Sequence, residues 1–217
     1  MKQANPNSDR TEVFLNQFEY PSQCPDPRSY GFDGSNQYYN LLYVVAKELQ
    51  PNLIVELGTC TGGSTSYLAA GTSGKVLSID IEIRPDAKKR LFAFDCVELT
   101  QGDTRDPDLV NEVAERGPID LLFIDTLHTA EQVTAELALF RPLVRLGGLI
   151  FFDDIRINPG MSAWWDSLDE DCCENTVLTL SPPSSSGEAL ACHSLPRKED
   201  LLELPEMHWT GFDVVFR

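Results

Sequence analysis

The stretch NLIVELGTCTGGSTSYLAAG, residues 52–71, decides the class of fold that this sequence predicts. Its first part, 52–58, is rich in Leu, Ile and Val, which is typical of a short buried strand. Gly58, Gly62 and Gly63 permit a tight turn, because glycine adopts backbone conformations that other residues avoid. The remainder, 63–71, is expected to form a helix that ends at a glycine. The stretch therefore predicts a strand, a glycine turn and a helix in succession.

The same alternation continues toward the C-terminus. Further apolar strands are expected at 75–81, 97–103, 119–125 and 147–154, and helices at 85–94, 106–117 and 129–140. The last of these helices begins with a capping-box pattern, Thr129 followed by Gln132. A helix at 35–49, ended by Pro51, precedes the first strand. Because five apolar strands alternate with helices, the sequence predicts a parallel sheet covered on both faces, the doubly wound α/β class.

The remaining segments complete the expected organisation. Residues 176–182 and 211–217 are predicted strands, which makes the sheet seven-stranded and mostly parallel with an antiparallel edge strand. A short helix is expected around 162–168. Residues 34–217 are long enough for a single domain. Residues 1–33 are polar and proline-rich and are expected to form an N-terminal arm, the candidate for contacts in a homo-oligomer.

The charge of the chain bears on its partners. Acids outnumber bases 34 to 17, which gives a formal net charge of −17. Such a surface repels phosphate backbones and anionic lipids, so we expect a small molecule as the partner and neither nucleic acid nor a membrane. The alternative is that the excess acid only keeps the protein soluble. The N-terminus lacks the apolar core of a signal peptide, and no apolar run reaches membrane-helix length, so a cytoplasmic protein is expected.

Each of the five central strands ends in a carboxylate. In doubly wound sheets, ligands bind at the carboxyl ends of the strands, so these acids are expected at one rim. They are Glu56, Asp80, Asp103, Asp125 and the adjacent pair Asp153 and Asp154. Two adjacent carboxylates beside an apolar strand cost free energy unless something pairs with them. A ligand site at this rim is therefore the first functional prediction.

The glycine turn indicates which cofactor occupies the rim. The dinucleotide pattern G-x-G-x-x-G requires glycine at position 60, which is Cys60. Glu56, just before the turn, would repel a pyrophosphate and suits a cationic ligand that carries an amine and a sulfonium. Asp80 lies about 20 residues further on, where an acid binds ribose hydroxyls. An NAD-dependent oxidoreductase is the less favoured alternative.

Several motifs resemble those of class I S-adenosylmethionine-dependent methyltransferases. They are VELGTCTGGST at 55–65, LSIDIE at 77–82, LTQGDTRD at 99–106 and GGLIFFDDI at 147–155. With FIDTLHTAEQV at 123–133, the chain looks like the small-molecule O-methyltransferase branch that includes macrocin-type and cephalosporin-pathway enzymes. The resemblance covers residues 50–156 and, loosely, the final strand. It implies methyl transfer from S-adenosylmethionine to a hydroxyl of a secondary metabolite, phenol or sugar.

The resemblance also implies roles for individual residues. The glycine turn would hold the methionine part of the cofactor, Asp80 the ribose, and Asp103 with Thr104 the adenine. The cofactor-binding set is Glu56, Gly58, Thr59, Gly62, Ser64, Asp80, Asp103, Thr104 and Asp125. Asp125, Asp153 and Asp154 match the ligands of a divalent cation in metal-dependent members. Carboxylate oxygens are the ligands that Mg²⁺ prefers, and a bound cation would acidify a substrate hydroxyl.

His128 is the candidate catalytic base, together with Asp125. It follows Asp125 by three residues, and its ordinary pKa near 6.5 suits proton transfer at neutral pH. The alternative is a loop histidine that only bonds a backbone carbonyl. Asp154 has an alternative as well, as a cap or as the partner of Arg156. A metal-independent or nitrogen-directed methyltransferase therefore stays open.

Aromatic residues are the weaker candidates for a substrate wall. Tyr38 lies in the first predicted helix, and Trp164 with Trp165 follows the acidic pair. Aromatic walls suit flat or glycosidic substrates. The alternative is that these aromatic side chains belong to the core.

Overall fold

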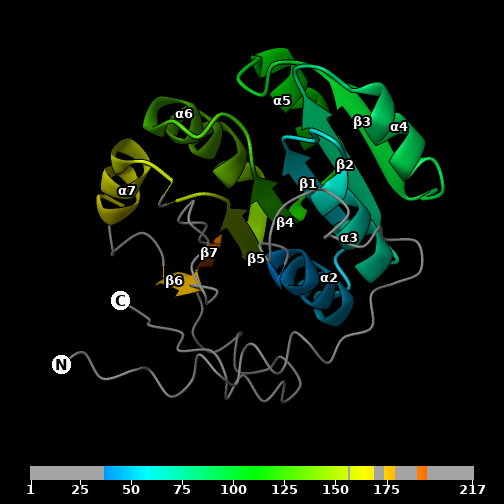
Figure 1. Cartoon of the computed structure of the whole chain (residues 1–217), viewed down its shortest axis with the longest axis horizontal. Coiled ribbons are helices and arrows are strands. Elements are labelled where there is room, and N and C mark those ends of the chain that lie inside the picture. Colours follow the sequence, from blue (N-terminus) through cyan, green and yellow to red (C-terminus); the bar gives the residue numbers. More distant parts are fainter. Residues whose placement is uncertain (1–36, 156, 169–173, 179–189, 195–217) are drawn as a thin grey trace.

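The computed structural model of the protein describes residues 37–155, 157–168, 174–178 and 190–194 (Figure 1). The central part alternates strands and helices as expected. The strands are β1 (Leu53–Leu57), β2 (Lys75–Asp80), β3 (Val97–Gln101), β4 (Ile119–Ile124), β5 (Val144–Phe152), β6 (Glu174–Leu178) and β7 (Leu190–Ser194). The helices are α2 (Gln37–Leu49), α3 (Gly63–Gly71), α4 (Pro85–Leu91), α5 (Pro107–Ala114), α6 (Ala130–Phe140) and α7 (Pro159–Asp166), with a 3₁₀ turn at Arg141–Leu143.

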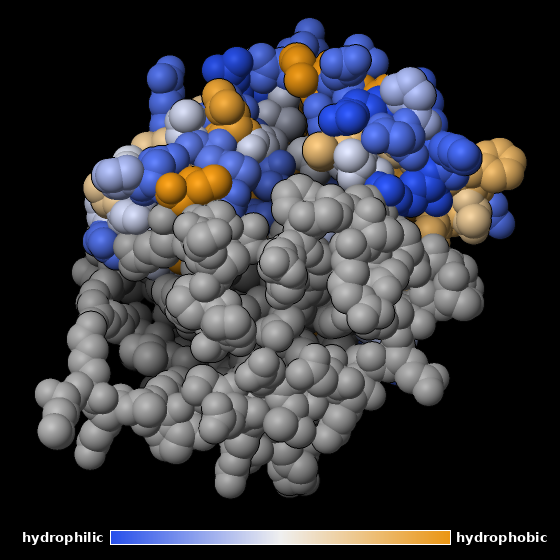
Figure 2. All heavy atoms as spheres, viewed as in Figure 1, coloured by the Kyte–Doolittle hydropathy of each residue, from blue (hydrophilic) through white to orange (hydrophobic). Residues whose placement is uncertain are grey.

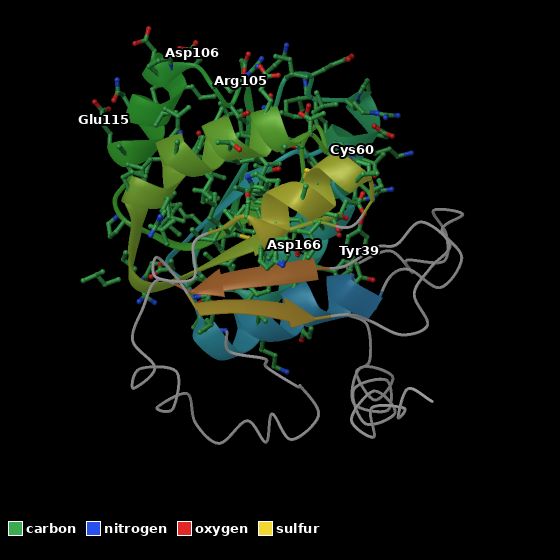
Figure 3. All side chains as sticks on the ribbon, turned by 90° about the vertical axis from the view of Figure 1, so that its left-hand side faces the viewer. Tyr39, Cys60, Arg105, Asp106, Glu115 and Asp166 are labelled. Carbon is green, nitrogen blue, oxygen red and sulfur yellow. The ribbon has the colours of Figure 1, made fainter. Side chains whose placement is uncertain are left out.

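The strands form one seven-stranded sheet in the order β3-β2-β1-β4-β5-β7-β6. Strands β1 to β5 are parallel to one another. Strands β2 and β3 are added on one side of β1, and β4 and β5 on the other, so the strand order reverses between β1 and β4. Strand β7 pairs antiparallel with both β5 and β6, and Figure 3 shows the β6 and β7 arrows pointing in opposite directions. The doubly wound, mostly parallel sheet is confirmed, but the antiparallel strand lies one position in from the edge.

Alternate residues of the central strands point to opposite faces of the sheet and belong to two separate hydrophobic cores. On one face, Ile54 and Phe123 pack with Leu42 of α2 and Leu68 of α3. On the other face, side chains of the same strands pack against α5, α6 and α7. Figure 3 shows α6 and α7 side by side over this second face. Burial on both faces explains why the strands are continuous apolar runs.

Several predicted boundaries differ from the structure. Strand β5 begins at Val144, because Val144 pairs with Ile119 and the register then shifts before Leu121 pairs with Leu149. Helix α7 begins at Pro159, because the Asn158 side chain caps it. The strand expected at 176–182 is observed at 174–178, and β7 at 190–194 was not predicted.

Some predictions lie outside the described residues. These are the N-terminal arm at 1–33 and the strand at 211–217. Within the part that the structure describes, no helix is long and apolar enough to cross a membrane. On the face seen in Figure 2, hydrophilic side chains cover much of the described surface, and the hydrophobic patches are separate from one another.

The end of the sheet opposite the acidic rim is fixed by one buried carboxylate. Asp120, at the start of β4, accepts hydrogen bonds from the backbone nitrogens of Asn52 and Leu53, at 2.7 and 3.0 Å. Its other oxygen pairs with Arg145 of β5. Burial raises the pKa of Asp120, but Arg145 and the two backbone donors outweigh burial and hold the pKa below its usual range. Three strands are thereby joined at one point, at the opposite end of β1 from the glycine turn.

Candidate active site

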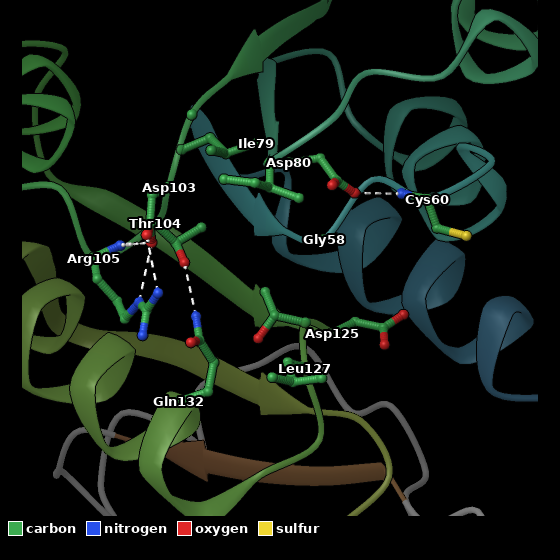
Figure 4. Close-up of a pocket in the computed structure, with 13 residues that line it drawn as sticks. Gly58, Cys60, Ile79, Asp80, Asp103, Thr104, Arg105, Asp125, Leu127 and Gln132 are labelled. Carbon is green, nitrogen blue, oxygen red and sulfur yellow. Dashed lines mark hydrogen bonds and ion pairs between the residues drawn. The ribbon is translucent and has the colours of Figure 1, made fainter.

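A pocket of about 340 Å³ lies at the carboxyl ends of strands β1 to β4 (Figure 4). Its position is the one that doubly wound sheets use for ligands, at the point where strand order reverses. Its volume is within the range of small-molecule sites. The lining residues are Gly58, Cys60, Ile79, Asp80, Ile81, Gly102, Asp103, Thr104, Arg105, Asp125, Thr126, Leu127 and Gln132.

The glycine turn approaches the end of β4 very closely. Gly58 has φ +100°, and a Cβ atom there would lie 1.8 Å from the carbonyl oxygen of Asp125. No other residue fits at this position, because the left-handed backbone and the missing space both exclude a side chain. The turn is also tied to β2, since the backbone nitrogens of Thr59 and Cys60 each donate to Asp80 Oδ2 at 2.8 Å. The β1–α3 turn therefore has a fixed position at one end of the pocket.

Glu56 lies beneath this turn and not on the pocket wall. Its side chain is fully buried. It accepts hydrogen bonds from Ser64 and Ser78, each at 2.5 Å, and from Thr65. Burial raises the pKa of Glu56 to about 7; the three hydroxyl donors oppose this rise, and the charge of Asp125 adds to it. In the structure Glu56 thus joins β1, β2 and α3, and its predicted contact with a cofactor stays a prediction.

At the other end of the pocket, Asp103 is engaged by Arg105. The Arg105 backbone nitrogen and Nε donate to Asp103 Oδ1 at 2.9 and 3.1 Å, and Nη2 donates to Oδ2 at 3.0 Å. The side-chain hydrogen bonds of Arg105 hold the pKa of Asp103 below its usual range. The pair is exposed, so its contribution to stability is small. It leaves the Asp103 carboxylate less available to a ligand than the sequence suggested.

A buried polar network lies behind the same end of the pocket. Glu136 of α6 is fully buried and accepts from Thr104 at 2.5 Å and from Thr126 at 2.7 Å. Gln132 Nε2 donates to Glu136 at 2.7 Å and to Thr104 Oγ1 at 3.2 Å. Only half of the predicted capping box forms, with Thr129 Oγ1 accepting from the Gln132 backbone at 3.3 Å. The Gln132 side chain turns instead toward the buried carboxylate, a stronger acceptor.

His128 stands between two of the predicted acids. Its Nε2 lies 3.1 Å from Asp125 Oδ1, and its Nδ1 lies 3.2 Å from Asp154 Oδ2. The hydrogen bond to Asp125 is the main cause that raises the pKa of His128; burial opposes the rise, and the charges of Asp154 and Asp125 add to it. The arrangement favours a protonated imidazole, because each carboxylate accepts a hydrogen bond from one ring nitrogen.

The backbone of the His128 loop is held by the segment before α7. Asn158 Nδ2 donates to the His128 carbonyl oxygen at 2.9 Å. The other end of the same amide caps α7, since Asn158 Oδ1 accepts from the Met161 backbone nitrogen at 2.9 Å. One side chain therefore links the candidate base to a helix of the core, a contact that the sequence pattern did not predict.

The three acids predicted to ligate a cation are not gathered into a cation site. Asp153 and Asp154 are both buried, and the Asp154 backbone nitrogen donates to Asp153 Oδ1 at 2.8 Å. The His128 ring occupies the place between Asp125 and Asp154. Among the described residues, no group of three or more His, Cys, Asp or Glu side chains is arranged to hold a metal ion.

The tryptophans predicted as a substrate wall are buried. Trp164 and Trp165 of α7 contact Phe152 of β5, with ring centroids 5.2 and 6.0 Å apart. Only 8% and 5% of their surfaces are exposed. In this structure they join α7 to the sheet, which agrees with the core alternative. The side chain of Tyr38 lies outside the described part of the chain, and its neighbour Tyr39 packs against Tyr67 with ring centroids 5.5 Å apart.

The structure thus divides the predicted cofactor residues into two groups. Gly58, Asp80, Asp103, Thr104 and Asp125 line the pocket. Glu56, Thr59, Gly62 and Ser64 lie outside its wall and shape the turn from below. The lining residues that sequence reasoning missed include Ile81 and Leu127, each 67% exposed despite being apolar. The available signal was their place just after a strand-ending acid, since Ile81 follows Asp80 directly and Leu127 lies two residues after Asp125.

The comparisons with known proteins find O-methyltransferases. The family model for rhamnosyl O-methyltransferase/CmcI matches residues 37–167. The rhamnosyl O-methyltransferase of Mycobacterium tuberculosis is 32% identical over 126 residues, which cover 52% of this chain and 50% of that protein. A catechol O-methyltransferase of the same species is 30% identical over 187 residues, which cover 82% of this chain and 77% of that protein.

The solved structures show the same fold. An O-methyltransferase from Bacillus cereus in complex with SAH has a TM-score of 0.59 at 18% identity, over 89% of this chain and 93% of that chain. The chain spans about half the length of the rhamnosyl relatives that it matches. Because the family model covers more than half of the 217 residues, this protein belongs to the rhamnosyl O-methyltransferase/CmcI family.

Proposed function

We propose that this protein transfers a methyl group from S-adenosylmethionine to a hydroxyl of a small molecule. The observation that carries the proposal is the pocket itself. Five residues predicted from four different strand ends line one cavity, and the candidate base His128 is bonded to one of them, Asp125. Membership of an O-methyltransferase family supports the same reaction.

The pocket residues fit the parts of this cofactor. Asp80 offers carboxylate oxygens next to the glycine turn, where ribose hydroxyls bind in related folds. Ile79, Ile81 and Leu127 offer apolar surface for a flat ring. Asp125 places a carboxylate on the wall, which suits a cationic sulfonium and an ammonium. When bound, S-adenosylmethionine supplies a methyl group attached to a sulfonium sulfur. The sulfur is the leaving group and becomes a thioether when an oxygen attacks the methyl carbon.

His128, which contacts the pocket residue Asp125, is the proposed acceptor of the proton from the attacking hydroxyl. In the structure both of its nitrogens face carboxylates, so the ring must lose one proton and release one contact before it can act as a base. Asp125 then holds the other nitrogen and orients the ring, as the carboxylate does in other catalytic pairs. With the cofactor bound, His128 would hold the proton that the attacking hydroxyl releases.

The divalent cation expected from the sequence remains a prediction. The donor types of Asp125, Asp153 and Asp154 fit a hard cation, but their arrangement does not, because His128 stands between Asp125 and Asp154. No step of the mechanism above depends on a metal. Methyl transfer measured after exhaustive chelation, with and without added Mg²⁺, decides the point: activity that returns only with Mg²⁺ would require His128 to move aside.

The names of the relatives support a choice of acceptors. Related proteins are described as acting on rhamnosyl and catechol groups, so a sugar hydroxyl and a phenol are the first acceptors to test. A panel of a methyl rhamnoside, a catechol and a matched primary amine, with radiolabelled S-adenosylmethionine, separates oxygen from nitrogen transfer. Labelling of the amine alone would favour the nitrogen-directed alternative.

Two measurements test the proposal. Calorimetry is expected to show that S-adenosylhomocysteine binds the full chain and that NAD does not. With an accepted substrate, His128→Ala is expected to lower kcat by roughly 10²–10⁴-fold, the usual contribution of a general base. Full turnover by His128→Ala would remove His128 from the mechanism, and binding of NAD alone would overturn the cofactor.

A further inference from the structure

Gln132 is a pocket residue to which the capping pattern gave only a structural role. It lies in the first turn of α6 and lines the pocket together with Thr104 and Leu127. Figure 4 shows it reaching from α6 toward Thr104, with Arg105 at the same end of the pocket. Its amide can therefore present either a hydrogen-bond donor or an acceptor to a ligand.

The hydrogen bonds of the amide nitrogen fix which way the group faces. Glu136 accepts from Gln132 Nε2 at 2.7 Å, and a carboxylate does not donate, so the nitrogen must be on that side. Thr104 gives its hydroxyl proton to Glu136 and therefore accepts the second Nε2 hydrogen, at 3.2 Å. Both amide hydrogens are used, and flipping the amide would place its oxygen against the buried carboxylate.

The amide oxygen is therefore an oriented acceptor. Gln132 is half-buried, and its Oε1 has no hydrogen-bond partner among the described residues. The other acceptor at this end, Asp103, takes three hydrogen bonds from Arg105. A ligand with a hydrogen-bond donor in this part of the pocket can therefore bond to Gln132 Oε1, which accepts fewer hydrogen bonds than the Asp103 carboxylate.

The purine is the part of the cofactor that reaches this end. Figure 4 shows the glycine turn with Gly58 and Cys60 at one end, Asp80 next, and Arg105 with Gln132 at the other end. Ribose at Asp80 places the base beyond it, between the apolar side chains of Ile81 and Leu127. Adenine carries a single donor group, its 6-amino group, and otherwise only acceptors.

We propose that Gln132 Oε1 accepts a hydrogen bond from the 6-amino group of the cofactor's adenine, and that Glu136 and Thr104 fix the amide for this purpose. The inference rests on the proposed function, because it assumes that the pocket holds an S-adenosyl group. Gln132 is then the residue that distinguishes adenine from a purine without a donor at this position.

The test compares two ligands by calorimetry on the full chain. One is S-adenosylhomocysteine, and the other is its analogue with hydrogen in place of the 6-amino group. One neutral hydrogen bond changes affinity roughly fivefold to tenfold, so the wild type is expected to prefer the adenine ligand by about that factor. Gln132→Leu, which keeps the size of the side chain without an acceptor, is expected to bring the preference within about twofold.

The controls separate this contact from general damage to the site. Gln101→Leu makes the same change at an exposed residue of β3 that does not line the pocket, and it is expected to keep the wild-type preference. Glu136→Leu removes the oxygen that accepts from Gln132 Nε2 and is expected to lower the preference. Thermal melts of each variant report whether it is folded.

The outcomes distinguish the inference from the function on which it rests. A wild-type protein that binds neither ligand contradicts the proposed cofactor. A wild type that binds both equally, or a Gln132→Leu variant that keeps the preference, overturns the role of Gln132. Loss of the preference in Asp103→Asn but not in Gln132→Leu would assign the 6-amino contact to Asp103 instead.

Discussion

At the scale of single residues, Glu56 makes folding stability depend on pH. Its folded pKa of about 7 exceeds the ordinary value of 4.5, so between these pH values the folded state holds a proton that the unfolded chain has lost. The stability that this proton gives is complete below pH 4.5 and is lost as pH rises through 7. Glu56→Gln cannot titrate. The wild type is therefore expected to lose stability relative to Glu56→Gln as pH rises from 4.5 to 8. The relative loss in free energy of unfolding is at most about 3 kcal/mol. Urea unfolding at several pH values measures this, and a difference constant with pH would show that Glu56 is ionised throughout.

At the scale of secondary-structure elements, α7 is coupled to the candidate base through Asn158. Aspartate caps helices as well as asparagine does but has no amide hydrogen for the His128 carbonyl. Asn158→Asp is therefore expected to keep the cap and lower kcat, whereas Asn158→Ala also loses about 1 kcal/mol of stability. The measurement is a double-mutant cycle with His128→Ala. In that background Asn158→Asp is expected to have little further effect on kcat. An equal loss in both backgrounds would mean that Asn158 acts on the fold alone.

A matched control exists for the cap itself. Asp106 caps α5 in the same way, accepting from the Asp108 backbone nitrogen at 3.0 Å, and it does not line the pocket. Asp106→Ala is expected to lower stability like Asn158→Ala while leaving kcat unchanged.

The elements also show what the sequence was able to predict. Strands β1 to β5 were predicted because burial on both faces leaves continuous apolar runs, and the glycines placed the turn that forms the pocket. Strand β7 was missed because LACHS contains none of the β-branched or aromatic residues that are typical of strands. The sequence predicts that the acids lie at one rim of the sheet. It does not predict that Glu56 lies under the turn or that His128 stands between Asp125 and Asp154. Such differences arise from side-chain contacts between elements, which periodicity does not encode.

At the scale of the whole molecule, the net charge of −17 predicts that salt stabilises the fold. Salt weakens two opposing effects, the repulsion among excess carboxylates and the attraction in exposed ion pairs. The exposed pairs of the described surface, such as Arg84 with Asp86 at 3.3 Å, contribute about 0–1 kcal/mol each. The repulsion involves 34 acids against 17 bases, so we expect it to be the larger effect. The melting temperature is therefore expected to rise between 10 and about 150 mM NaCl, where the Debye length falls to roughly 8 Å.

A single substitution tests whether repulsion is the cause. Glu115 is exposed at the C-terminal end of α5, where the helix dipole favours a positive charge (Figure 3). Glu115→Lys removes one excess acid and places a cation there, so it is expected to add about 0.3–1 kcal/mol at low salt. Glu115→Gln removes the acid alone and is expected to give part of that gain. Both gains shrink at high salt if long-range charge causes them, because screening removes that interaction first. A gain that is the same at both salt concentrations would instead be a local effect of helix propensity, and the net charge would then have no measurable part in the stability of this fold.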